Sequence, residues 1–199
     1  MTGLFKMTNG STRERLLAVG VEQFLKSGYA ATGVKEILAA AGVPKGSFYH
    51  YFPSKEAFAN EVINCYFNQE AALIESVFGD AAVRPLKRLR TYFERLAERY
   101  ETGGPVGGCL FGNMSQEVAD HSVALQSLLR NKFHAWQGAL ADMVRQAKAQ
   151  GELPKTTKPD EIAAFLLNGW QGALVRMKAE KSTAPLHEFL KIAFQHVVR

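Results

Sequence analysis

Cysteine and long apolar runs are the two things that this chain of 199 residues most clearly lacks. Its two cysteines, Cys65 and Cys109, are far apart and in no metal-ligand spacing, so neither a disulfide framework nor a metal site is expected. No apolar stretch approaches the ~18 residues that a membrane span needs. The first ten residues contain no apolar core of a signal peptide. These absences predict a cytoplasmic protein with no metal, no cofactor and no membrane partner.

Positive charge is concentrated at the beginning of the chain. Residues 1–55 contain seven Lys or Arg and three Glu, a net charge of +4, whereas residues 56–199 carry only +1 of the total of +5. Such an asymmetry favours a polyanionic partner for the first quarter of the chain and a nearly neutral remainder.

Apolar residues recur at helical spacing almost everywhere, and no alternating run predicts a strand. Ser11 and Glu14 form a capping-box signature at the start of the first helix. Thr32 is predicted to cap a short second helix, and Ser54 a long fourth one. The pattern predicts an all-α fold of about nine helices. After the first, helices are expected at about 34–41, 44–52, 84–100, 123–150, 159–181 and 185–198, with two more beginning after Ser54 and around Cys109.

The two short helices around Gly42 have the proportions of a helix-turn-helix, whose second helix enters the major groove of DNA. Phe48 and Phe52, four residues apart, are predicted to anchor this second helix to the core. Its remaining side chains are polar or hydrogen-bonding, as base and phosphate contacts require. The same pair of helices also fits a simple packing corner rich in aromatic residues.

Residues 43–56, VPKGSFYHYFPSKE, resemble the signature of TetR-family transcriptional repressors, and the resemblance extends without a gap over about residues 11–60. It implies a homodimer that binds pseudo-palindromic operator DNA through residues 1–55. Residues 56–199 would then form a helical domain for effector sensing and dimerisation. By the same resemblance, Ser47, Tyr49 and His50 face the groove, and Tyr51 and Lys55 hold phosphates. Thr32 and Lys35 would clamp the flanking backbone. Two more DNA contacts are predicted from the residue types alone: Lys45 is polar, and the small Gly46 lets the helix approach the duplex closely.

Cys109 is the candidate sensor of the inducer. It follows two glycines and is predicted to start a helix, where the free amides favour the thiolate and the glycines leave room for an electrophile. Residues 108–110 and 115–120 also resemble the electrophile-responsive, N-ethylmaleimide-type branch of the family. A cation from Lys178 or Arg176 would assist such a thiol. A small, inert, buried cysteine is the alternative interpretation, and it is the one we favour for Cys65.

A non-covalent pocket for an apolar inducer is the competing hypothesis for the second domain. Large side chains of its central helices would line this pocket: Tyr92, Phe93, Phe111, Met114, Phe133, Trp136, Met143 and Trp170. The resemblance further implies a four-helix dimer interface from the last two helices, for which the apolar candidates are Phe165, Leu166, Trp170, Leu174, Leu186, Phe189, Ala193, Phe194 and Val197. The same stripes also fit burial within one chain.

Two other classes of protein, an enzyme and an adaptor, fit the sequence less well than a repressor. A cysteine-dependent enzyme would rest on Cys109 alone, because no second catalytic motif, phosphate loop or pair of carboxylates accompanies it. An adaptor using the helix-turn-helix only for protein contacts leaves the basic excess of residues 1–55 unexplained. The sequence therefore predicts a DNA-binding repressor, not an enzyme, that is released by a small molecule or an electrophile.

Overall fold

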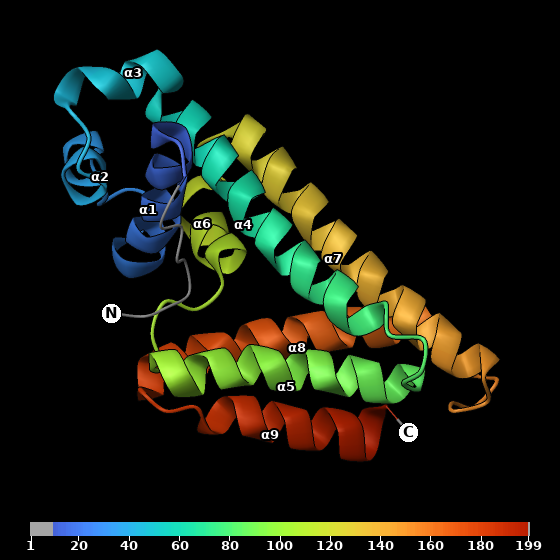
Figure 1. Ribbon diagram of the computed structural model, residues 1–199. Coiled ribbons are helices and arrows are strands. Elements are labelled where there is room, and N and C mark those ends of the chain that lie inside the picture. The colour runs from blue at the N-terminus through green and yellow to red at the C-terminus, as the bar shows by residue number, and fades with distance from the viewer. Residues whose placement is uncertain (1–9, 199) are drawn as a thin grey trace. The chain divides into compact units, whose positions relative to one another are not determined.

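The computed structural model describes residues 10–198, with the exception of the side chain of Lys45. Within that range the chain forms nine α-helices and no strand, which confirms the predicted all-α fold. Figure 1 shows the helices in chain order. Their bounds are α1 Thr12–Ser27, α2 Val34–Ala41, α3 Phe48–Tyr51, α4 Lys55–Phe78, α5 Pro85–Gly103, α6 Leu110–Val118, α7 Val123–Ala149, α8 Pro159–Glu180 and α9 Ala184–Ile192, with a 3₁₀ turn η1 at Lys45–Ser47 and a π-helical turn η2 at Ala193–Val197.

Two compact units make up the chain. The N-terminal unit contains the residues up to Gln69 together with Cys109–Lys132, and the C-terminal unit contains Glu70–Gly108 and the residues from Phe133 onward. The long helices α4 and α7 therefore contribute to both units. The boundaries of these compact units differ from the functional domain boundary predicted after residue 55, and that boundary stays a prediction.

A cluster of aromatic rings forms the core of the N-terminal unit. Phe58 of α4 lies 5.9, 5.2 and 4.9 Å, between ring centroids, from Phe24, Phe48 and Phe52 respectively. The predicted capping box at the start of α1 is present, since the Ser11 hydroxyl accepts from the amide of Glu14 and the Glu14 carboxylate accepts from that of Ser11. The sequence pattern thus places α1, α3 and α4 around one apolar centre, as predicted for the Phe48 and Phe52 anchor.

The segment after α2 is less regular than predicted. Gly42 adopts the left-handed conformation, with φ of 63°, and closes α2 through its amide. Instead of one helix over 44–52, a 3₁₀ turn at Lys45–Ser47 leads into the single α-helical turn of α3. Tight 3₁₀ turns are common at the starts of α-helices, and Pro44 supplies neither an amide nor a side-chain cap to this one.

The prediction that Thr32 caps α2 is wrong. The residue at the cap is Gly33, without a side-chain hydrogen bond. The Thr32 hydroxyl instead donates to the carbonyl oxygens of Gly28, at 2.6 Å, and Gln23, at 3.3 Å, and the residue is only 2% exposed. Its oxygen is turned inward because carbonyls at the end of α1 need a donor.

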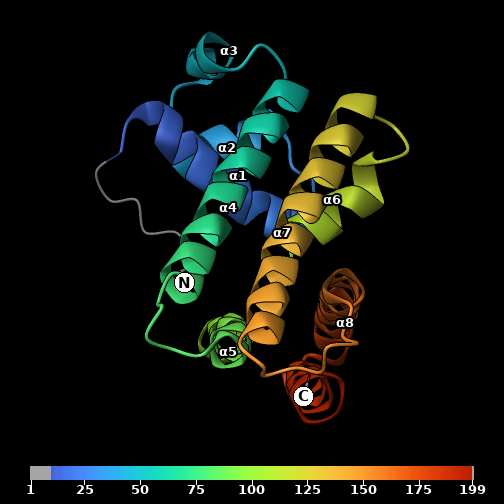
Figure 2. The same ribbon diagram turned by 90° about the vertical axis from the view of Figure 1, so that its right-hand side faces the viewer.

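In the C-terminal unit, α5, α8 and α9 run alongside one another and cluster around a common centre (Figures 1 and 2). Phe93 of α5, Trp170 of α8 and Phe189 of α9 meet in its core with ring centroids 5.2 to 5.6 Å apart. The buried guanidinium of Arg88 donates to the carbonyl of Phe78 and to the Gln146 side chain. Through this arginine the end of α4 is joined to α5 and α7. No helix in residues 10–198 is long and apolar enough to cross a membrane.

Candidate nucleic-acid interface and effector residues

Polar side chains cover the outer face of η1 and α3. Tyr49 is 66% exposed, and His50 and Tyr51 are also exposed, whereas Phe48, between Ser47 and Tyr49, is completely buried. The rings of His50 and Tyr51 meet edge to face at 5.0 Å. One short turn therefore exposes three consecutive hydrogen-bonding side chains next to a buried aromatic anchor, and contact with base edges needs such accessible donors and acceptors.

The other predicted DNA contacts fall into different environments. Lys35 on α2 and Gly46 on η1 are exposed, and Ser47 is half-buried. The side chain of Lys45 lies outside what the structure describes. Thr32 has a buried hydroxyl that is already donating, so only its backbone remains available for the predicted phosphate contact.

Lys55 is held against its own protein. Its ammonium nitrogen lies 4.4 Å from the centre of the Tyr29 ring and 3.4 Å from the carbonyl oxygen of Ala30. Burial lowers the pKa of Lys55 below its ordinary value, although the charges of Glu117 and Glu36 oppose this shift. The predicted phosphate-binding lysine is therefore engaged by the loop between α1 and α2, which the sequence did not indicate.

Cys109 stands at the start of α6, as predicted, and is its N-cap residue. The two glycines before it, Gly107 and Gly108, have φ of 81° and 74°, which side chains rarely tolerate. However, Cys109 is only 4% exposed, so the open access expected from these glycines is wrong. Cys65 on α4 is half-buried, and burial raises the pKa of its thiol.

The predicted effector residues are divided between the two units. Cys109, Phe111 and Met114 lie together on α6 in the N-terminal unit, where Phe111 packs edge-on against Tyr66 at 5.0 Å. The remaining three belong to the C-terminal unit, Trp136 on α7 and Trp170 and Lys178 on α8. Both tryptophans are buried.

Most of the side chains predicted for the dimer interface are buried or half-buried within the single chain, and the interface itself stays a prediction. Five of these side chains are at most 2% exposed: Leu166, Trp170, Leu174, Leu186 and Ala193. Phe189 is 9% exposed, and Phe194 and Val197 are half-buried. Of the predicted residues only Phe165 is exposed, at 45%.

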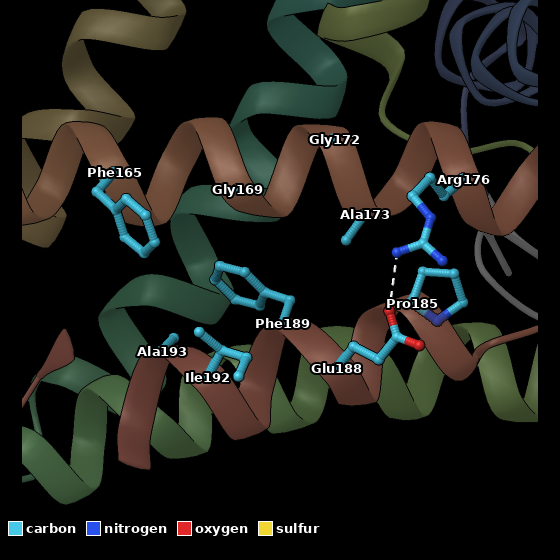
Figure 3. Close-up of a pocket in the computed structure, with 10 residues that line it drawn as sticks. All are labelled: Phe165, Gly169, Gly172, Ala173, Arg176, Pro185, Glu188, Phe189, Ile192 and Ala193. Atoms are coloured by element: carbon cyan, nitrogen blue, oxygen red, sulfur yellow. Dashed lines mark hydrogen bonds and ion pairs between the residues drawn. The ribbon is translucent and has the colours of Figure 1, made fainter. Parts of the chain in front are cut away.

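A groove between α8 and α9 lies beside Phe165 (Figure 3). Its volume is about 310 Å³, and the exposed Ile192 lines its α9 side. An ion pair at 2.8 Å between Arg176 and Glu188 spans it. On α8 the lining follows the spacing Phe165, Gly169, Gly172, Arg176, one face of a helix. That spacing is visible in the sequence, but the larger apolar side chains of α8 form a second stripe, which faces inward.

Glu117 is a further residue that the sequence analysis missed. From α6 its carboxylate accepts hydrogen bonds from the backbone amides of Tyr29, at 3.1 Å, and Ala30, at 2.8 Å. These partners are more than eighty residues away in sequence, so no local pattern could have identified the contact.

The chain is similar to known regulators along nearly its whole length. Residues 16–62 match the family model described as bacterial regulatory proteins, tetR family, and residues 85–193 match the one described as tetracyclin repressor-like, C-terminal domain. It is 36% identical to the HTH-type transcriptional repressor DhaR of Mycobacterium sp. (strain GP1), over 95% of this chain and 93% of that protein. It is 32% identical to the HTH-type transcriptional repressor NemR of Escherichia coli K12, over 93% of each.

Solved structures agree with this relationship. A crystal structure of a regulatory protein TetR from Rhodobacter sphaeroides superimposes with a TM-score of 0.88 at 37% identity, covering 93% of this chain and 98% of the other. The crystal structure of Escherichia coli NemR in its reduced form gives a TM-score of 0.85 at 30% identity, covering 94% and 97%. The relatives are transcriptional regulators, not enzymes, and regulators of this kind bind operator DNA and usually act as dimers. The chain belongs to the TetR family and is a DNA-binding transcriptional repressor with an N-terminal helix-turn-helix.

Proposed function

We propose that this repressor reads its operator with Ser47, Tyr49 and His50 and is released when an electrophile reacts at Cys109. The exposure of Tyr49 and His50 over the buried Phe48 carries the first half of the proposal. Lys35, exposed on α2 before the turn, and Tyr51, exposed at the end of α3 after it, are assigned to phosphates, which position the protein without reading bases. Lys45 and the small Gly46 belong to the same proposed surface.

The sensing half rests on the place of Cys109 at the beginning of α6. Free amides at a helix start stabilise a thiolate, the nucleophilic form. With N-ethylmaleimide, the thiolate sulfur would add to the carbon–carbon double bond, and the resulting carbanion would take a proton from water. The adduct does not fit a site in which Cys109 is 4% exposed and Phe111 and Met114 are buried on the same helix, so α6 would have to move. The similarity to NemR, known also as a reduced-form structure, supports a thiol-based sensor.

A non-covalent pocket in the C-terminal unit is the second candidate for inducer binding. Two buried donors there, Nε2 of Gln171 and Nε of Arg88, find no acceptor among the described residues. Buried donors without partners are rare and costly, and a polar group on a ligand is one way to satisfy them. The predicted tryptophans of this pocket, Trp136 and Trp170, belong to the same unit.

The dimer interface would be the α8–α9 face around the groove of Figure 3. Phe165 and Ile192, 45% and 49% exposed, project from it. Among the described residues, no atom beyond the local helix backbone lies within 4 Å of a Cβ added at Gly172, which leaves room for a partner helix there, whereas the space at Gly169 is filled by Phe189 of the same chain. A second copy of the chain would cover these apolar groups and bring two helix-turn-helix motifs into one molecule, as recognition of two half-sites about 34–36 Å apart requires.

Fluorescence-anisotropy titration on a duplex that the protein itself selects from a random-sequence pool tests the proposal. Wild type, Cys109→Ser and the matched control Cys65→Ser are compared with and without N-ethylmaleimide. We expect the reagent to weaken operator binding by wild type and Cys65→Ser about 100-fold, a differential free energy of about 2.7 kcal/mol, and to leave Cys109→Ser bound. If all three bind and none responds, the thiol sensor is refuted and the pocket becomes the preferred site. If no sequence is selected, the assignment of base-reading residues fails.

A further inference from the structure

Glu117 links the last turn of α6 to the loop that leads into the helix-turn-helix. One carboxylate oxygen accepts from the Tyr29 amide at 3.1 Å and the other from the Ala30 amide at 2.8 Å. Both bonds are charge-assisted, the stronger class of hydrogen bond. A single side chain thus holds two consecutive peptide groups between α1 and α2.

The loop is shaped around this carboxylate. Gly28 precedes the two amides, and a Cβ atom added there would lie 2.6 Å from the nearer Glu117 oxygen. Its φ of 84° is also unfavourable for any other residue. Glycine is therefore required both for the turn and for the close approach of Glu117.

Helix α4 contacts the same loop at a backbone carbonyl, whereas Glu117 binds its amides. The ammonium of Lys55 lies 3.4 Å from the Ala30 carbonyl oxygen and over the Tyr29 ring, and the charge of Glu117 attracts it. The next residue, Glu56, accepts a hydrogen bond of 2.7 Å from the hydroxyl of Ser122, four residues after the end of α6. Two carboxylates and one ammonium thus form a polar clamp, made of Glu117, Lys55 and the Glu56–Ser122 pair, around the start of the DNA-binding motif.

We propose that Glu117 is a positioning residue for operator recognition: it sets the α1–α2 loop, and through it α2, in the orientation that sequence-specific binding needs. This inference rests on the proposed DNA-binding function. It also gives α6 a mechanical role, because the helix that carries Glu117 in its last turn has Cys109 as its N-cap residue. A displacement of α6 would act on the two amides directly.

Electrostatics and positioning predict opposite effects for the loss of this carboxylate. Removal of one negative charge near a DNA-binding surface strengthens binding to any sequence, because DNA is a polyanion. Loss of the loop geometry weakens binding only where side chains must meet base edges. The ratio of specific to non-specific affinity therefore separates the two effects. Partial unfolding of a variant would lower both affinities by the same factor and leave this ratio unchanged.

Glu117→Ala and Glu117→Gln are compared with wild type and with Gln116→Ala, an exposed neighbour, on the selected operator duplex and on a scrambled duplex of equal length. We expect the specificity ratio to fall about tenfold or more in Glu117→Ala and less in Glu117→Gln, whose amide oxygen still accepts one bond. Binding to the scrambled duplex should stay equal or become stronger, and Gln116→Ala should behave as wild type.

An unchanged ratio in both variants, or an equal loss on both duplexes, would overturn the positioning role. The failure of the proposed function is a separate result, since wild type itself would then show no preference for any duplex.

Discussion

Phe58 is the residue on which the DNA-binding motif is built. It is fully buried and touches three other phenylalanine rings, from α1, from α3 and from the residue after α3. Truncation of such a side chain leaves a cavity that the surrounding rings cannot fill, and typically costs about 3–5 kcal/mol.

Phe58→Ala should therefore lose about that much of its free energy of unfolding, measured by urea denaturation. Tyr49→Ala provides the matched comparison, since its side chain is 66% exposed; we expect its stability to change by less than about 0.5 kcal/mol while affinity for the selected operator falls. A stable Phe58→Ala, or a Tyr49→Ala variant with full affinity, would contradict this division of fold and function.

The sequence predicted the aromatic anchors at this scale correctly but not the polar contacts. Phe48 and Phe52 were identified because burial follows local spacing. The hydroxyl of Thr32 and the ammonium of Lys55 found partners at carbonyls of the same unit. Which carbonyls lack a donor depends on how helices end and meet, and no residue pattern contains that information.

At the scale of helices, the pair Glu70–Arg99 joins α4 to α5 in the C-terminal unit. The carboxylate and guanidinium are 2.6 Å apart, and 14% of the Glu70 side chain is exposed. Burial raises the pKa of the Glu70 carboxyl above its ordinary value, and Arg99 opposes this shift only in part. The folded protein consequently holds a proton on Glu70 at pH values where the unfolded chain has released it.

This contribution to stability is complete below the pKa of the unfolded state and is lost as pH rises through the higher pKa of the folded state. Wild type should therefore lose stability relative to Glu70→Gln as pH increases from about 4.5, the ordinary value, towards neutrality. Urea unfolding of both proteins over this range measures the difference. A difference that does not vary with pH would show that the carboxyl does not titrate as described.

At the scale of the whole molecule, dimerisation decides whether two recognition motifs act together. Two exposed large apolar side chains, Phe165 and Ile192, line the groove between α8 and α9. An acidic side chain there would be buried without a partner in a dimer, at a cost of several kcal/mol.

We expect Phe165→Asp and Ile192→Asp to be monomeric by sedimentation velocity and to lose at least about tenfold in operator affinity, because each half-site would then bind alone. Val123→Asp is the control: Val123 is more exposed, at 82%, but belongs to the N-terminal unit. Dimers of unchanged stability in the first two variants would place the interface elsewhere.

Local patterns in the chain are sufficient for its helical class, the capping of α1, the Gly42 turn and the aromatic anchors of the DNA-binding motif, since these depend on residues within a few positions of one another. The specific signature of residues 43–56 is equally local and carries the family. Only the tertiary structure decided that Cys109 is buried, that the large apolar side chains of α8 and α9 face inward, and that Glu117 holds the loop before α2. Each of these depends on contacts between segments far apart in sequence. An apolar stripe on one helix can pack against any of several other helices or against a partner chain, and the stripe itself does not say which.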